Sequence, residues 1–265
     1  MLTLGWFSTG GGEGSRGLLR MAQEAIERGK LQARIQFVFS NREPGEAEGS
    51  DLYFQQVRAY GIPLVTCSSQ RFRRERAGGP ISRHRLEFDR EVIRRLEGYE
   101  PELCVLAGYM LILGPEMCRR YTMLNLHPAL PHGPTGTWQE VIWKLIEEGA
   151  EETGAFIHLA TEELDRGPAL TYCSFPLRGD AFDQLWARID GRSVEDLKTN
   201  QGEELSLFQL IRQEGVRRER PLLLETLKAF ATGELRVEGR RALDSRGRPL
   251  DGPLCLNEAI ERALA

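Results

Sequence analysis

Asn125 and His127 place an amide and an imidazole two residues apart in the run 123–127. Alternate side chains of an extended segment point the same way, so these two groups would lie side by side while Leu124 and Leu126 face the core. Both groups can donate hydrogen bonds to a developing negative charge. Such a pair at the carboxyl end of a strand is a usual way for an α/β sheet to build a site.

Asp165 offers a carboxylate on the turn-like segment 162–168, between two strand-like runs. A carboxylate beside an imidazole favours its charged form and can orient the ring. Taken alone, a histidine at the end of a strand is more often structural than catalytic. The neighbouring amide and the carboxylate on a turn reverse that preference, so the pattern indicates a site with Asp165 as the orienting group for His127.

A glycine-rich segment, residues 10–17, follows the first strand-like run and opens a helical pattern. Its backbone N–H groups could surround a phosphate at the positive end of that helix. Gly12, Gly14 and Gly17 fit the GxGxxG pattern, but a dinucleotide site also requires an acidic residue where residues 39–42 read Phe-Ser-Asn-Arg. We therefore expect a phosphate-bearing substrate; the alternative is a tight turn that binds nothing.

These groups need a scaffold, and apolar runs alternate with amphipathic segments along the first two thirds of the chain. This alternation is typical of βαβ units and predicts an α/β fold, a mostly parallel sheet flanked by helices. We expect strands at 2–8, 34–40, 63–68, 102–107, 123–127, 154–160 and 169–177, and helices at 15–28, 82–97 and 138–148. Beyond residue 178, charged helical patterns predict a helical extension over 179–265 with a short hairpin around residues 244–247.

Composition narrows the class of protein. Of the 265 residues, 41% are hydrophobic and 28% are charged, which is ordinary for a globular protein with a substantial core. The net charge of −4 gives no basic field, so we expect no nucleic-acid partner. Neither a secretory signal nor a membrane-length apolar run is visible, which predicts a cytoplasmic protein with no membrane partner. No cluster of metal-ligating residues is visible, and we expect no metal.

Five motifs occur between Met1 and about Leu177. They are Gly14-Ser15, Phe39-Ser40-Asn41, the run 106–113, Asn125-Leu126-His127-Pro128, and the stretch from His158 through Glu163-Leu164-Asp165 to Gly167-Pro168. On these motifs and their order the chain resembles glycinamide ribonucleotide formyltransferase, a family with the Rossmann-like fold of the folate-dependent formyltransferases. The last third matches loosely. We therefore expect a catalytic domain over 1–178, with a phosphate-binding first half and a folate-binding and catalytic second half.

The resemblance implies three sets of site residues. The catalytic set is Asn125, His127 and Asp165. The phosphate set is Gly14, Ser15, Arg16 and Arg85. The folate set, for 10-formyltetrahydrofolate as co-substrate, is Tyr109, Met110, Leu111 and Glu163. Glu214 would match a ribose-binding glutamate, although the histidine that the family has beside it is Gly215 here.

The chemistry that the resemblance implies agrees with the residue types. When an amine attacks a formyl carbon, negative charge develops on the formyl oxygen, and Asn125 and a protonated His127 can stabilise it as hydrogen-bond donors. Asp165 would favour the charged imidazole and order a water that carries the amine proton to the folate nitrogen. The reaction requires neither a covalent intermediate nor a metal.

Two departures from the family leave the acceptor open. Arg16 stands where the family usually has an asparagine, and the loop 129–138 replaces a leucine-rich proline loop that precedes a histidine-containing helix. The leading acceptor is glycinamide ribonucleotide, in purine synthesis. The same fold could serve another amine, such as an amino sugar nucleotide, or water, as in a formyltetrahydrofolate hydrolase. More distant alternatives are a nucleotide-binding oxidoreductase and a non-catalytic sensor.

The remaining features carry less weight. The sequence predicts structural roles for His132 and His158. The extension over 179–265 could cover a larger substrate or provide the contact of a homodimer.

Overall fold

The structure is a computed structural model that describes residues 1–76, 78–163 and 166–265. The chain divides into two compact units, each made of several segments. The first unit consists of Met1–Asn125, His158–Pro168 and Leu227–Leu250, and the second of Leu126–Ile157, Ala169–Thr226 and Asp251–Ala265. Asn125 thus belongs to the first unit and His127 to the second.

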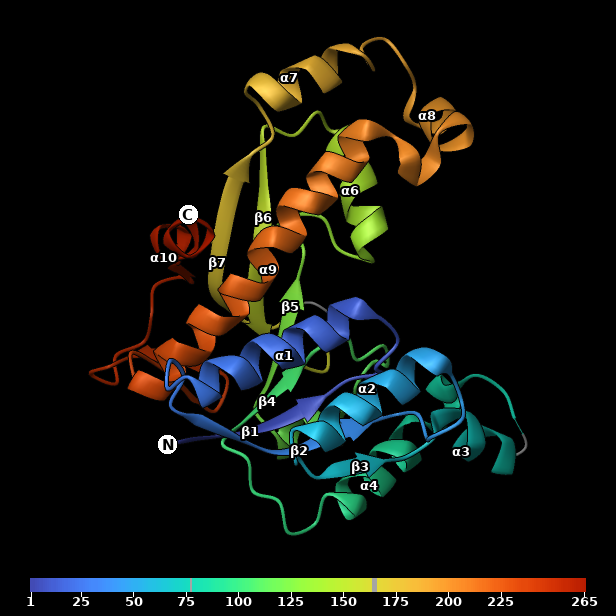
Figure 1. Ribbon diagram of the computed structural model, residues 1–265, viewed down its shortest axis with the longest axis vertical. Helices are drawn as coiled ribbons and strands as arrows, with labels where there is room; N and C mark the ends of the chain where they lie inside the picture. The colour runs from blue at the N-terminus through green and yellow to red at the C-terminus, as the bar shows by residue number, and fades with distance from the viewer. Residues whose placement is uncertain (77, 164–165) are drawn as a thin grey trace. The chain divides into compact units, whose positions relative to one another are not determined.

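The elements of the described residues follow one another in a largely alternating order (Figure 1). They are β1 (Leu2–Phe7), α1 (Glu13–Glu27), β2 (Ala33–Ser40), α2 (Glu48–Ala59), β3 (Leu64–Thr66), α3 (Ser69–Glu75), a 3₁₀ turn (Ile81–His84), α4 (Arg85–Arg95), β4 (Leu103–Leu106), α5 (Pro115–Arg120), β5 (Met123–His127), α6 (Trp138–Glu147), β6 (Glu152–Leu159), β7 (Ala169–Pro176), α7 (Asp180–Ala187), α8 (Val194–Asn200), a second 3₁₀ turn (Gly202–Glu204), α9 (Ser206–Thr232), β8 (Leu235–Glu238), β9 (Arg241–Asp244), β10 (Leu254–Cys255) and α10 (Asn257–Leu264).

The main sheet has the strand order β10-β7-β6-β5-β4-β1-β2-β3, and β8 pairs with β9 in a separate antiparallel hairpin. The pairs β1–β2, β1–β4, β2–β3, β4–β5 and β7–β10 are parallel. This confirms the mostly parallel α/β sheet that the alternating pattern predicts.

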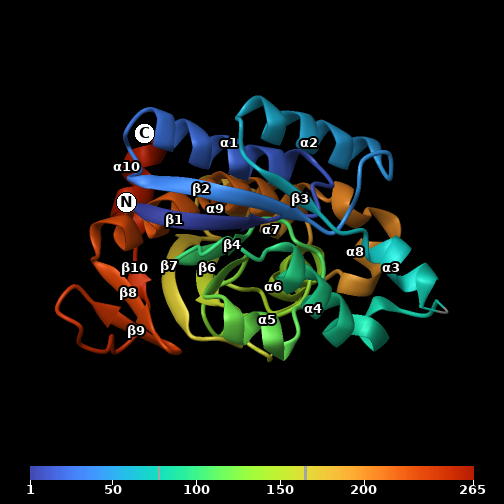
Figure 2. The same ribbon diagram turned by 90° about the horizontal axis from the view of Figure 1, so that it is seen from below.

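In the first unit, helices cover both faces of β1, β2 and β3. Figure 2 shows α1 and α2 on one face and α4 and α5 on the other. Because both faces are covered, β1, β2 and β4 are buried along most of their length. Aromatic rings fill the core, and the rings of Phe7 and Phe39 lie 5.3 Å apart.

The strand order of the first unit contains a topological switch point between β1 and β4. β1 pairs with β2 on one side and with β4 on the other. Open α/β sheets bind ligands outside the carboxyl ends of the strands at such a point. The glycine-rich segment follows β1 there, and residues 108–114, called the 108–114 segment below, follow β4.

In the second unit, α9 runs along β7 (Figure 1), and the hydroxyl groups of Thr171 and Thr226 hydrogen-bond at 2.7 Å. Helix α6 begins with a capping box, in which Thr137 accepts a hydrogen bond from the Glu140 N–H and the Glu140 carboxylate accepts one from the Thr137 N–H. The core packs α6 against α9, with the rings of Trp143 and Phe208 4.9 Å apart.

The predicted short hairpin around residues 244–247 is present, with an antiparallel bridge between Leu243 and Pro249, and the hairpin of β8 and β9 precedes it. The turn between β8 and β9 lies at residues 239–240, where Gly239 has a φ of 61°. A second turn follows, closed by a hydrogen bond of 2.8 Å from the Asp244 N–H to the Arg248 carbonyl oxygen. The functional division at residue 178 stays a prediction. Among the described residues, no helix has the length and apolar character that crossing a membrane requires.

Candidate active site

The amide of Asn125 is held by a buried histidine of the first unit. Asn125 Nδ2 lies 3.2 Å from His158 Nε2, and His158 Nδ1 lies 3.0 Å from the carbonyl oxygen of Leu159. A carbonyl oxygen can only accept, so Nδ1 carries the ring hydrogen and Nε2 accepts from the Asn125 amide. The contact fixes which way the amide of Asn125 points.

His158 is a site residue that the sequence does not predict. Its side chain is 1% exposed inside the apolar strand β6, and its ring reaches Asn125 on β5. A lone imidazole in a fully buried strand must find polar partners, and this is the signal that could have drawn attention to it. Its partner could not be foreseen, because that depends on which residues of the two strands lie opposite each other.

His127 lies in the second unit and is 4% exposed. Its Nε2 is 3.0 Å from the carbonyl oxygen of Pro134, and its ring packs against Phe156 with centroids 5.4 Å apart. Because the carbonyl oxygen accepts, Nε2 carries a hydrogen in this arrangement. The loop after β5 therefore holds the imidazole in place.

The same loop contains His132, whose φ of 70° makes it the sole non-glycine residue with positive φ among the residues described. Such a conformation is costly and persists where its surroundings impose it. Residues 132–136 also line an open cavity of about 630 Å³ together with Glu140, Lys144 and Glu148 of the α6 region. The loop that departs from the family pattern thus forms a cavity wall in the second unit.

The glycine-rich segment of the first unit leads into α1, which begins at Glu13. The Arg16 guanidinium is 3.2 Å from the Glu13 carboxylate, and Arg20 binds the same carboxylate. Burial acts in the other direction, but hydrogen bonds from Arg16 and Arg20 keep the pKa of Glu13 below its usual value. A side chain added at Gly14 would meet open space, whereas one at Gly108 would collide with the Ser15 hydroxyl.

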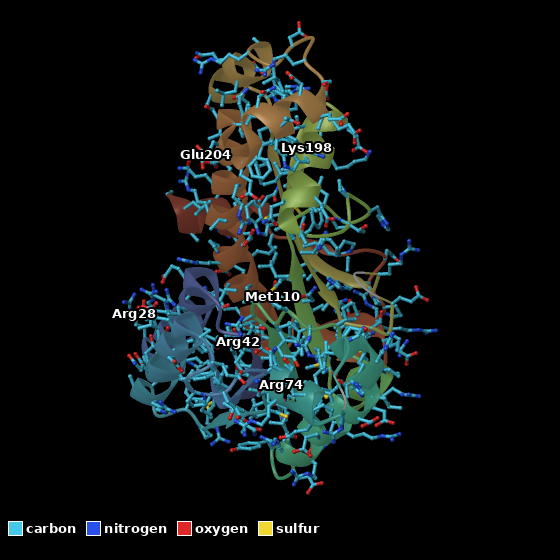
Figure 3. All side chains as sticks on the ribbon, turned by 90° about the vertical axis from the view of Figure 1, so that its right-hand side faces the viewer. Arg28, Arg42, Arg74, Met110, Lys198 and Glu204 are labelled. Carbon is cyan, nitrogen blue, oxygen red and sulfur yellow. The ribbon has the colours of Figure 1, made fainter. Side chains whose placement is uncertain are left out.

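The side chains of the 108–114 segment differ in exposure. The Tyr109 ring packs between Phe7 and Phe39, with centroids at 5.9 and 6.2 Å, and burial raises the pKa of its hydroxyl. Met110, labelled in Figure 3, is 74% exposed. Its neighbour Leu111 is partly buried.

A cavity of about 200 Å³ lies beside this segment, within the first unit. Its lining combines the apolar side chains of residues 109–112 with Arg85 and Asp89 of α4. The Asp89 carboxylate is 4% exposed and accepts a hydrogen bond of 2.7 Å from the Gly114 N–H. Desolvation raises the pKa of Asp89 to about 6, against the opposing effects of that hydrogen bond and of the Arg85 charge.

Arg85 therefore lies with the folate set, along the wall of this cavity. Its aliphatic carbons pack close to Gly114, at the end of the segment. The sequence assigns Arg85 to the phosphate set instead, and its contact with a phosphate stays a prediction.

The α/β fold agrees with the comparisons to known proteins. The family model described as formyl transferase matches residues 12–190. Phosphoribosylglycinamide formyltransferase of Escherichia coli (strain K12) is 32% identical over 181 residues, which cover 67% of this chain and 76% of that protein. The chain belongs to the formyl transferase family.

Solved structures of formyl transferases share the fold. Glycinamide ribonucleotide transformylase 1 from Symbiobacterium toebii superposes with a TM-score of 0.63 at 25% identity, covering 95% of each chain. A formyltetrahydrofolate deformylase from Burkholderia mallei has a TM-score of 0.61 at 18% identity, covering 92% of this chain and 69% of that one. The likeness to the deformylase is one of fold alone.

The remaining predicted residues fall in different places. Glu163 is exposed, and its carbonyl oxygen accepts a hydrogen bond of 3.1 Å from the Thr161 hydroxyl. Asp165 lies outside the described residues. Glu214, in the second unit and beyond the matched range, binds Arg218 at 2.6 Å, and Arg218 also binds Glu261 of α10 at 3.0 Å. Glu214 therefore takes part in fastening α10, and its contact with a ribose stays a prediction.

The described part of the chain contains no group of three or more His, Cys, Asp or Glu side chains arranged to hold a metal ion.

Proposed function

We propose that this formyl transferase moves a formyl group from 10-formyltetrahydrofolate to the amine of glycinamide ribonucleotide, a step of purine synthesis. The observation that carries the proposal is the 32% identity to the Escherichia coli enzyme of that name over 181 residues, together with the family match from residue 12 to 190. That range contains all the members of the catalytic and folate sets.

Asn125 would act as the donor to the formyl oxygen. Its contact with His158 orients the amide before substrate arrives, and the amide would then donate to the charge that develops on the formyl oxygen. A donor that is already oriented costs no reorganisation during the reaction. His158 is thus proposed as a positioning residue, and Asn125 as a catalytic one.

His127 and Asp165 would complete the catalytic set. The burial of His127 and its contacts with Pro134 and Phe156 support a fixed imidazole, as general acid–base chemistry requires. Asp165 would favour the charged imidazole and order the water that carries the amine proton. This assignment rests on the resemblance of the motif around Asp165.

The reduced folate would use the 108–114 segment and the cavity beside it. The apolar wall of the cavity suits the aromatic parts of a folate. Glu163 and the main chain of Tyr109, Met110 and Leu111 complete the proposed folate site.

The phosphorylated acceptor would bind at the glycine-rich segment, where the N-terminus of α1 and Arg16 offer positive charge. Arg16 is already held by Glu13, so a phosphate would share or replace that carboxylate as its partner. The proposal also places the protein in the cytoplasm and includes its assembly as a homodimer.

Incubation of the protein with 10-formyltetrahydrofolate and separate candidate amines tests the proposal, with release of tetrahydrofolate as the readout. Of the amines tested, only glycinamide ribonucleotide is expected to support turnover. Turnover with an amino sugar nucleotide instead would change the acceptor, and release without any amine would make the protein a hydrolase. Asn125→Ala serves as the matched inactive control in each reaction.

A further inference from the structure

The hydroxyl group of Thr9 joins the ends of three strands of the first unit. Thr9 follows β1, and its Oγ1 donates a hydrogen bond of 2.7 Å to Asn41 Oδ1, just after β2. The same oxygen accepts a hydrogen bond of 3.0 Å from the backbone N–H of Met110, beyond β4. The Thr9 N–H in turn donates to the carbonyl oxygen of Gly108 at 3.0 Å.

Burial makes these contacts difficult to replace. Thr9 is 4% exposed and Asn41 is 5% exposed. Ser69 provides a second hydrogen-bond partner for the Asn41 amide, whose Nδ2 donates to the Ser69 hydroxyl at 3.2 Å. Removing the Thr9 hydroxyl would therefore leave a buried amide oxygen and a backbone N–H without their partner, and such groups are costly to leave unpaired.

Met110 depends on this hydroxyl because its own side chain provides little anchorage. The side chain is 74% exposed, so packing does not hold the residue, whereas the ring of Tyr109 beside it is packed between two phenylalanines. At Gly108, a φ of 70° bends the backbone at the start of the segment. The hydrogen bond to Thr9 is thus what fixes the direction of the main chain at Met110.

The glycine-rich segment and the 108–114 segment are also in close contact at a second point, since a Cβ atom on Gly108 would collide with the Ser15 hydroxyl. The two segments carry residues of different proposed sets, phosphate and folate. Both lie at the switch point between β1 and β4, where ligand contacts are expected.

From this geometry we propose that Thr9 is a positioning residue, which holds the main chain of Gly108–Met110 in the form that binds the reduced folate. The inference rests on the proposed function, since it concerns the folate half of that site. Thr9 touches no substrate; it acts through the Met110 N–H.

Thr9→Val tests this inference, because valine keeps the shape of threonine and removes the hydroxyl. The affinity for tetrahydrofolate, measured by calorimetry on the whole chain, should fall about tenfold, the factor that corresponds to one net hydrogen bond. Hydrogen exchange of the Met110 amide should become faster in the same variant. Thr9→Ser keeps the hydroxyl and should restore both quantities to within about twofold of the wild type.

Ser69→Ala is the matched control. It removes a buried hydrogen bond of the same chain of contacts but leaves Thr9 bound to Met110. It should lower stability without changing the affinity for tetrahydrofolate by more than about twofold. If Thr9→Val does not fold, Thr9→Cys replaces it, since a thiol is a weak donor and acceptor and should give a smaller loss of affinity.

Three results would overturn the inference. Equal folate affinity in Thr9→Val and the wild type would refute the positioning role alone, and so would an equal loss in Ser69→Ala and Thr9→Val. Wild-type protein that binds no tetrahydrofolate would refute the proposed function, and this inference with it, while exchange at Met110 would still report whether the hydrogen bond exists.

Discussion

Replacing Asp89 with asparagine should remove a pH dependence of stability that the buried carboxyl creates. Desolvation raises the pKa of Asp89 from 3.8 to about 6 in the folded protein. The folded state therefore keeps the proton up to about pH 6, whereas the unfolded chain releases it near pH 3.8. The contribution of Asp89 to stability is fully present below pH 3.8 and is lost as the pH rises through 6.

The size of the effect follows from the shift. At about 1.4 kcal/mol for each pKa unit, the folded protein loses roughly 3 kcal/mol between low and neutral pH through this group. About 1.4 kcal/mol of this loss falls between pH 5 and 7.5. Asparagine can still accept the hydrogen bond from the Gly114 N–H, so Asp89→Asn should keep the contact and lose the pH dependence.

Urea unfolding at several pH values between about 5 and 7.5 measures the effect, as the free energy of unfolding of Asp89→Asn minus that of the wild type. The difference should grow by about 1.4 kcal/mol over this range. Asp244→Asn is the control, because Arg248 lowers the pKa of Asp244 and its titration lies below the range. Parallel curves for the wild type and Asp89→Asn would refute the reasoning, because Asp89 would then titrate below this range, as it would if the Arg85 charge outweighed burial.

Three further predictions concern the proposed reaction. Asn125→Ala should lower kcat by about two to three orders of magnitude and leave folate affinity nearly unchanged, since it removes one oxyanion donor; equal losses of stability and activity would make Asn125 structural. Arg16→Ala should raise the KM for the phosphorylated acceptor and leave that for formyl-folate unchanged, and steady-state kinetics with each substrate varied would expose the opposite pattern. Asp165→Asn combined with His127→Ala should lose much less activity than the product of the two single losses, because the two residues act as a unit; fully multiplicative losses would separate them.

The sheet and its motifs could be predicted because most strands are short apolar runs, and β2 and β4 follow helical patterns. β5 begins and ends at the residues expected, and so the spacing of Asn125 and His127 along one strand is confirmed. Helices α2 and α3 were not predicted. Helix α2 contains Gly49 and Ser50 in its first turn, and α3 is only seven residues long, so neither shows a strong helical period.

Site residues that act through a partner could not be found from local patterns. His158 and Asn125 are 33 residues apart, and the pair depends on the register of β5 against β6. Asp89 resembles any charged residue of an amphipathic helix until the Gly114 N–H is seen to bind it. In both cases the function of the side chain comes from burial, and burial is a property of the packed elements.

The switch point explains why these hidden residues gather where they do. A parallel sheet leaves the polar groups at the carboxyl ends of its strands without ladder partners, and at the switch point the neighbouring chains leave in opposite directions. Thr9 satisfies groups from two neighbouring strand ends there, and Asp89 satisfies one at the far end of the 108–114 segment. A side chain that meets this requirement of the fold also fixes the main chain that faces the ligand. Stability and substrate positioning therefore depend on the same hydrogen bonds, and only a variant that lowers stability but keeps the contact of Thr9 with Met110, such as Ser69→Ala, can separate them.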